Sequence, residues 1–246
     1  MSSLPLEIID LIVDLLHNEP KALKACCIVS KAWIYRTRKH LFNHVKFRPR
    51  GRHVSRWRET FPDLLNSPAH HTQILSIHVT SLITAADVDT LLTFCGISHL
   101  DVDTTRWYDR SFSLLPLHRL SPAVRSLHLT FSSLQSLEIL DLICSFPVLE
   151  DLTLAGHDGW NGYGAWNIPS TSPRLTGSLE LRVGAGIQHI THKLLDFPNG
   201  LQFEKISVRW SVPQGIGSTA NLVSRCSDTL ESLKITNYLK GALSRP

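Results

Sequence analysis

The chain has 246 residues, of which 43% are apolar and 19% are charged, and its formal net charge is +4. This composition is typical of a globular protein with one or two domains. No stretch approaches the run of about eighteen apolar residues that a membrane helix needs, so we expect no membrane partner.

The first apolar stretch is broken by Glu7, Asp10 and Asp14, so we expect no signal peptide. The cysteines show neither a Cys-x-x-Cys pair nor a matched histidine spacing. We therefore expect no disulfide framework and no zinc site, and we expect no other metal and no cofactor. Free thiols, most of them buried, fit a reducing compartment, which places the protein in the cytoplasm, the nucleus or both.

Residues 4–47 carry the periodicity of three short helices. The first helix has two apolar stripes on adjacent faces, formed by Ile8, Leu11, Ile12, Leu15 and Leu16 and by Ile9, Val13 and Leu16. Pro20 begins the second helix, since proline is favoured at the first helical position, and Trp33 belongs to the third. Helices this short cannot bury so much apolar surface among themselves. The surplus must face a partner or the rest of the chain.

This segment resembles an F-box. The resemblance is carried by Leu4-Pro5-x-Glu7-Ile8, Leu16, Leu23, Cys26, Val29-Ser30-Lys31-x-Trp33 and Leu41-Phe42. It implies that residues 1–47 dock onto a Skp-type adaptor and, through the adaptor, onto a cullin in a ubiquitin ligase. The residues that match the adaptor-binding face of the family are Leu4, Pro5, Ile8, Leu16, Val29 and Trp33.

Residues 48–73 are interpreted as a basic connector, interrupted by Pro49, Gly51, Pro62 and Pro68. Residues 31–58 contain ten lysines and arginines and no acid. Such a segment can be a solvated helix face, can meet an acidic patch on a partner, or can bind nucleic acid. We favour the solvated face and do not expect nucleic acid to be the partner.

Residues 74–246 contain a repeat. Seven segments alternate apolar and polar residues, as strands with one buried face do, at 74–80, 97–103, 124–130, 149–155, 177–183, 203–209 and 230–236. Alignment on Ile77, Leu100, Leu127, Leu152, Leu179, Ile206 and Leu233 gives spacings of 23 to 27 residues. This period lies in the range of leucine-rich repeats. Helical patterns fill several of the gaps, so strand and helix alternate.

The cysteines at Cys95, Cys144 and Cys226 fall at the ends of three predicted helices, where we expect them to be small apolar plugs. The two later repeats resemble the cysteine-containing class of leucine-rich repeat, which commonly follows an F-box. The predicted fold is therefore α/β: a three-helix F-box, then a curved solenoid of about seven strands with a parallel sheet on the concave face and helices outside. Residues 237–246 show no polar terminal cap, so we expect either that this end of the repeats meets a partner or that the sequence is shortened there.

The exposed strand positions predict a binding wall for a target protein. The predicted residues are His78, Asp101, His128, Thr153 and Glu180, and Ser207 and Lys234 continue the column. A Gly-rich loop adds Trp160, Tyr163 and Trp166, which are residue types that dominate binding hot spots. The alternative interpretations are a merely soluble surface for the column and aromatic side chains that pack back onto the repeats for the loop.

No motif of a known catalytic site is present, and we expect no catalytic residue and no enzyme activity. The predicted function is a non-catalytic substrate-recognition subunit of a cullin-type ubiquitin ligase, which binds a Skp-type adaptor and an unidentified target protein. The alternative is a ligase-independent leucine-rich-repeat scaffold, in which the three helices seal one end of the repeats. The two differ in whether the apolar surplus of the first helix is covered by the protein's own repeats.

Overall fold

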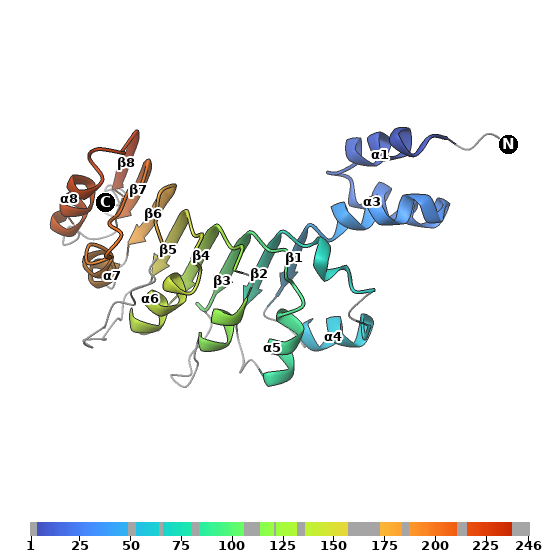
Figure 1. Cartoon of the computed structure of the whole chain (residues 1–246), viewed down its shortest axis with the longest axis horizontal. Helices are drawn as coiled ribbons and strands as arrows, with labels where there is room; N and C mark the ends of the chain where they lie inside the picture. Colours follow the sequence, from blue (N-terminus) through green and yellow to red (C-terminus); the bar gives the residue numbers. More distant parts are fainter. Residues whose placement is uncertain are drawn as a thin grey trace, which may run out of the picture.

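The computed structural model describes residues 4–48, 53–63, 66–79, 84–105, 114–120, 122–131, 136–156, 173–183, 187–210 and 216–237. Three N-terminal helices precede one parallel sheet that carries helices on one face (Figure 1). The expected α/β class is confirmed. No helix within these ranges is long and apolar enough to cross a bilayer.

The N-terminal unit comprises α1 (Leu6–Leu15), α2 (Pro20–Val29) and α3 (Lys31–Leu41). Pro20 begins α2 as expected, and Ser30 caps α3 by accepting a hydrogen bond from the amide of Ala32 at 3.3 Å. Both α1 and α2 pack on α3. Their common core is small and consists of Ile9, Val13 and Leu23, with Leu16, Trp33 and Leu41 packed against it. The second of the two predicted stripes on the first helix therefore faces inward.

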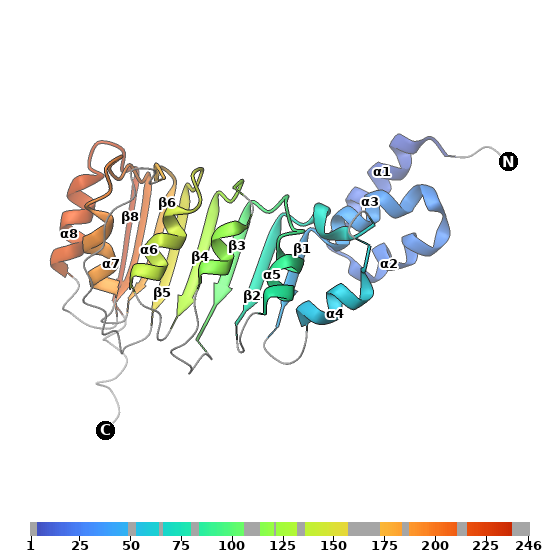
Figure 2. The same cartoon turned by 60° about the horizontal axis from the view of Figure 1, so that its bottom comes forward.

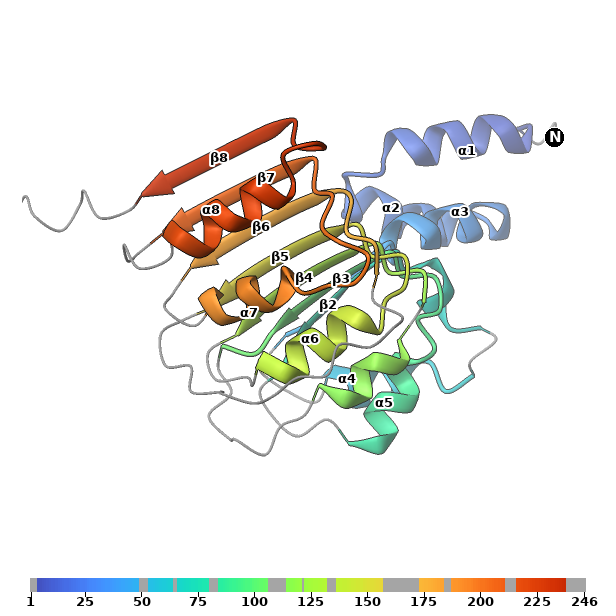
Figure 3. The same ribbon diagram turned by 60° about the vertical axis from the view of Figure 1, so that its left-hand side comes forward.

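The sheet contains eight strands in sequence order, all parallel. They are β1 (His44–Phe47), β2 (Ile74–His78), β3 (His99–Asp103), β4 (Ser126–Phe131), β5 (Asp151–Gly156), β6 (Ser178–Val183), β7 (Lys205–Trp210) and β8 (Ser232–Asn237). The strands labelled in Figure 3 all point the same way. Each of the seven predicted segments overlaps one of the strands β2 to β8.

The first strand, β1, was not expected, because it lies inside residues 1–47, which were interpreted as the helical unit. It pairs in parallel with β2, and its Val45 and Phe47 are buried in the large core of the sheet. The chain passes from α3 to β1 in two residues, so the last part of the predicted F-box range is the first strand of the sheet.

Helices cover one face of the sheet and leave the other face open (Figures 1 and 2). The elements on the covered side are α4 (His53–Thr60), η1 (Pro68–His71), α5 (Ala85–Leu91), η2 (Leu115–Arg119), α6 (Ser136–Cys144), α7 (Ile187–Leu194) and α8 (Ile216–Arg225). Parallel neighbours need a crossover between them, and these segments lie in the crossovers between β1 and β5 and between β6 and β8. Alternate strand residues such as Leu100, Leu127 and Leu152 point into the resulting core and are at most 1% exposed.

The register of β2 corrects one part of the sequence alignment. Leu75, and not Ile77, lies beside Leu100 and therefore in register with Leu127 and the later repeats. Ile77 pairs instead with Val102, two residues further along β3. The alignment was shifted by two residues because Leu75 and Ile77 are both buried apolar residues of the same face.

Two of the three predicted cysteine plugs lie where they were expected. Cys226 is 1% exposed, and Cys144 is packed against the core. Cys95 is exposed, so the prediction for this residue is wrong. The reason is that α5 ends at Leu91, and Cys95 therefore lies past the helix.

The helical unit is joined to the sheet by an aromatic cluster at the β1 end. Its members are Phe42, Phe47, Trp57, Phe61 and Phe94, whose neighbouring rings lie 4.8–6.0 Å apart, most of them edge to face. The hydroxyl of Thr72 also donates to the carbonyl of Phe42 at 2.9 Å. These contacts fix the end of α3 to the start of the sheet.

At the opposite end of the sheet, β8 has one neighbouring strand among the described residues. Its helix-facing Leu233 and Ile235 are 45% and 51% exposed, whereas the equivalent Ile206 and Val208 of β7 are buried. Within the described ranges, no element covers these two side chains as α8 and its neighbours cover β7.

Candidate functional site

The most prominent surface feature of the N-terminal unit is an apolar stripe along α1. Leu4, Ile8, Leu11 and Leu15 follow one another at helical spacing, and they are 55%, 43%, 58% and 75% exposed. We call these four residues the α1 stripe. The α1 stripe does not touch the sheet, because α1 packs on α3 beyond the β1 end of the sheet (Figures 1 and 2). The protein's own repeats therefore leave this surface uncovered.

The position of α1 is fixed by contacts on the faces of the helix that do not carry the α1 stripe. Ile9 and Val13 enter the small core, and the carboxylate of Asp14 accepts hydrogen bonds from α3. The guanidinium of Arg36 donates to both oxygens of Asp14, at 2.7 and 2.5 Å, and Nε2 of His40 lies 2.7 Å from Oδ1. These bonds, the one from Arg36 above all, hold the pKa of Asp14 well below its ordinary value. The Asp14–Arg36 ion pair and the small core thus orient α1 so that the α1 stripe faces away from α3.

The predicted adaptor-binding residues divide into two groups. Leu4, Pro5, Ile8 and Val29 are exposed, and Val29 is 69% exposed at the end of α2. Leu16 and Trp33 are partly buried against the small core, so their role is to support the surface. The structure also exposes residues that were absent from the predicted set, namely Leu11, Leu15 and the neighbouring Ile28. The spacing of Leu11 and Leu15 relative to Ile8 was the signal that could have placed them there.

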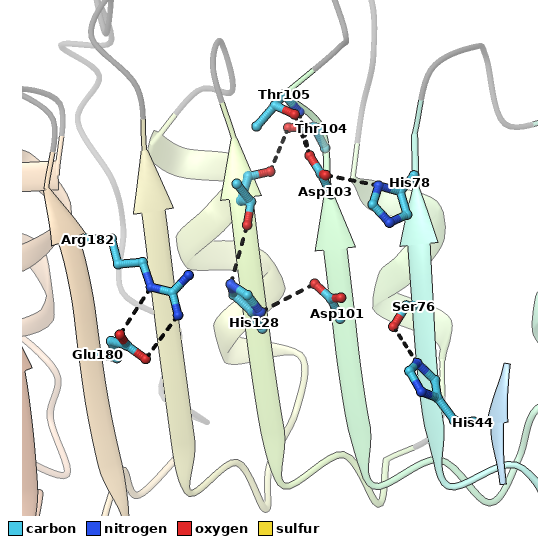
Figure 4. Close-up of polar contacts among 11 residues, drawn as sticks. His44, Ser76, His78, Asp101, Asp103, Thr104, Thr105, His128, Glu180 and Arg182 are labelled. Carbon is cyan, nitrogen blue, oxygen red and sulfur yellow. Dashed lines mark hydrogen bonds and ion pairs between the residues drawn. The ribbon is translucent and has the colours of Figure 1, made fainter. Parts of the chain in front are cut away.

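The second surface is the open face of the sheet. Its central column, from β1 to β8, consists of Lys46, Ser76, Asp101, His128, Thr153, Glu180, Ser207 and Lys234. The predicted placement in one column holds from Asp101 onward and is wrong at His78, because of the shifted register of β2. The predicted role of the column in target binding stays a prediction. His78 lies in the adjacent column, beside Asp103. Figure 4 draws some of these side chains, among them Ser76, His78, Asp101, His128 and Glu180, and they lie in front of the sheet, with the helices behind it.

Two histidine–aspartate pairs occupy the part of the open face formed by β2, β3 and β4 (Figure 4). Nδ1 of His78 lies 2.9 Å from Oδ2 of Asp103, and Nδ1 of His128 lies 3.4 Å from Oδ1 of Asp101. Burial raises the pKa of Asp103, but hydrogen bonds from Thr105 and the nearby His78 together lower it by more than burial raises it. The pKa of Asp103 is therefore below the ordinary value. The two carboxylates are thus already engaged within the protein.

A denser ion-pair cluster lies on β6 and β7. Both Nε of Arg182 and a terminal nitrogen of Arg209 lie 3.1 Å from Oε1 of Glu180. Burial raises the pKa of Glu180, but the hydrogen bond and charge of Arg182, followed by the charges of Arg209 and His128, lower it below its ordinary value. One carboxylate therefore faces two guanidinium groups, and the cluster keeps a positive excess.

The remaining sequence predictions have mixed outcomes. Trp160, Tyr163 and Trp166 lie outside the described residues, so their predicted role in target binding stays a prediction. The basic residues between 31 and 58 do not form one surface: Arg36 is paired with Asp14, Lys46 lies on the open face, and Arg58 approaches Asp87 at 3.9 Å on the covered side.

The described part of the chain contains no cluster of three or more histidine, cysteine or acidic side chains suited to a metal. A cavity of about 280 Å³ lies between α4 and α5, lined mainly by Trp57, Phe61, Pro62 and Ala86, with Arg58 and Asp89 also on its wall. The α1 stripe and the open face remain the two surfaces that match the residues predicted from sequence.

Comparison with known proteins gives no match: no family model fits the sequence, and neither the curated proteins nor the solved structures contain a significant similarity to it.

Proposed function

We propose that this chain is an F-box protein with leucine-rich repeats, and that it serves as a non-catalytic substrate-recognition subunit of a cullin-type ubiquitin ligase. In this proposal α1 to α3 bind a Skp-type adaptor, and the open face of the repeat solenoid holds a target protein. Such a subunit works in the cytoplasm, the nucleus or both. The F-box pattern in residues 4–42 motivates the proposal, and the α1 stripe is the observation that supports it most.

The physical argument concerns the exposure of the α1 stripe. Exposure of four large apolar side chains in one row, three on α1 and Leu4 just before it, costs free energy in water, at about 25 cal/mol for each Å² of apolar surface. Contiguous apolar surface of this kind marks a site of protein interaction more often than scattered exposed residues do. A scaffold whose helices only seal the end of the repeats would turn this stripe toward the sheet. The stripe is instead exposed and makes no contact with the sheet, and this favours a separate partner.

The catalytic contribution of such a subunit is proximity. A target on the open face and an adaptor on α1 are held on one molecule, so the target meets a ubiquitin-loaded enzyme at a raised effective concentration. No acid, base or nucleophile of this chain takes part in the proposed reaction.

The proposal is tested by co-expressing the full chain with a Skp-type adaptor and a cullin and purifying through a tag on the chain. The expected result is co-elution of all three proteins, with loss of adaptor and cullin together when Ile8 and Leu11 are both replaced by Asp. Removing residues 1–47 is a poor test, because it also removes β1 from the sheet. A chain that folds and elutes without adaptor would instead favour the ligase-independent scaffold.

A further inference from the structure

The open face changes in charge along the sheet. On β2 to β5 its outward positions include three aspartates, Asp101, Asp103 and Asp151, and no lysine or arginine. On β6 to β8 the outward positions form a block of three by three residues. These nine residues are Ser178, Glu180 and Arg182, then Lys205, Ser207 and Arg209, then Ser232, Lys234 and Thr236. The block holds four cations, four hydroxyls, one acid and no apolar side chain.

The four cations of this block, Arg182, Lys205, Arg209 and Lys234, are here called the cationic patch. Lys205 and Lys234 are exposed, and neither has an ion-pair partner among the described residues. Arg182 and Arg209 share the single carboxylate of Glu180. Within the block, the four cations therefore face one carboxylate, and the exposed Glu204 and Glu231 lie just outside it, before Lys205 and Ser232.

The acids on the other part of the open face do not offset this excess. Asp101 and Asp103 face His128 and His78, and Asp151 accepts hydrogen bonds from the amide and the hydroxyl of Ser178 at 2.7 and 2.6 Å. Because these three acids of the open face lie on β3 and β5 and the cationic patch lies on β6 to β8, an acidic ligand would be repelled from the first region and attracted to the second.

We propose that the cationic patch is the docking site for an acidic, Asp- and Glu-rich segment of the target protein. Neighbouring strands lie about 4.8 Å apart and alternate residues about 6.6 Å apart, so the block measures roughly 10 by 13 Å, the length of about four extended residues. Lysine ammonium groups and serine hydroxyls can donate to several carboxylates over this area. The inference rests on the proposed function only in taking the open face as the place where a target binds.

The test uses the full chain and a fluorescent peptide of about ten residues in which Glu and Ser alternate, an extended length that exceeds the block. The comparison peptide has Gln in place of Glu, and binding is measured by fluorescence anisotropy at low and physiological salt. The variant Lys205→Glu/Lys234→Glu is matched by Lys21→Glu/Lys24→Glu, which changes the net charge equally on exposed positions of α2. Glu180→Gln provides a variant with the opposite expected effect.

We expect the Glu peptide to bind more tightly than the Gln peptide, with salt weakening only the former. The Lys205→Glu/Lys234→Glu variant should lose about tenfold in affinity, since two exposed attractions become repulsions. The α2 variant should bind as the wild type does, and Glu180→Gln should bind the peptide more tightly. Thermal unfolding verifies that each variant is folded.

Three results would overturn the inference: no preference for the Glu peptide, equal affinity in the two lysine variants, or tighter binding of a single-stranded RNA to the patch than of the Glu peptide. The adaptor is absent from this assay, so the two proposals can fail separately. Peptide binding without adaptor binding would remove the ligase role alone. Adaptor binding without peptide binding would remove the acidic target alone.

Discussion

Truncation of the α1 stripe should weaken adaptor binding without unfolding the protein. The perturbation is the double variant Ile8→Ala/Leu11→Ala in the full chain. Ile8 and Leu11 are 43% and 58% exposed, so about half of each side chain is available to a partner. Complete burial of such a side chain stabilises by about 1.5–3 kcal/mol, and covering the exposed half therefore contributes about 1 kcal/mol for each residue.

The expected loss for the double variant is about 2 kcal/mol, which corresponds to about a thirtyfold increase in the Kd of the adaptor complex. The replacement Ile8→Asp/Leu11→Asp should weaken binding further, because an interface that covers two carboxylates must also strip them of water. Isothermal titration calorimetry with a purified Skp-type adaptor measures both effects. Burial of apolar surface should also appear as a negative heat-capacity change on binding, which the variants reduce.

The matched control is Val148→Ala, which truncates an apolar residue of comparable exposure, 41%, just before β5. This variant should leave the Kd unchanged. Because all of these side chains are substantially exposed, thermal unfolding should move little in any of the alanine variants. The reasoning is refuted if the wild-type chain binds the adaptor and the Ile8→Ala/Leu11→Ala variant binds it equally well.

Four further predictions concern stability and reactivity. Hydrogen bonds from α3 depress the pKa of Asp14, so its ionised carboxylate stabilises the fold fully above the ordinary pKa of 3.8, and this stabilisation is lost as the pH falls toward the folded-state pKa. Asp14→Asn should therefore lower the Tm at neutral pH, and the difference in Tm between variant and wild type should narrow below pH 3.8. Gly177→Ala would place a Cβ 2.6 Å from Oδ1 of Asp151, the first residue of β5, and should lower the free energy of unfolding in urea by about 1–3 kcal/mol. Gly217→Ala on α8, with nothing within 4 Å, should be neutral or stabilise by up to about 1 kcal/mol. The exposed Cys95 should react with iodoacetamide before Cys144, whose pKa burial raises to about 12; faster labelling of Cys144 in mass spectrometry would contradict this.

The alternation of apolar and polar residues was sufficient to predict seven of the strands. The strands β2 to β7 bury alternate residues in one continuous core, and the spacing of the repeat follows from the length of one strand and its crossover. The register of β2 was not predictable from the same pattern. Leu75, Ile77 and Val79 are all buried, so a shift of two residues preserves the buried face and changes only the neighbours.

The strand β1 was missed for a different reason. Its four residues directly follow α3, and a segment this short has too little periodicity to separate it from the end of a helix. Its pairing with β2 is a tertiary property that no local pattern reports. On α1, by contrast, both stripes were visible in the sequence. Packing decided that Ile9 and Val13 face inward and that Ile8 and Leu11 remain exposed.

The absence of a flexible linker between the helices and the sheet matters for the proposed proximity mechanism. A target gains from being tethered only if the distance and direction to the ubiquitin-loaded enzyme are restricted. Here α3 continues into β1 after two residues, and the rings of Phe42, Phe47 and Trp57 pack edge to face across the junction. Buried aromatic pairs of this type contribute about 0.5–1.5 kcal/mol each beyond the area that they bury. The sheet therefore continues the helical unit through a short, packed junction, so that a target on β6 to β8 would be presented at a restricted position relative to whatever protein covers the α1 stripe.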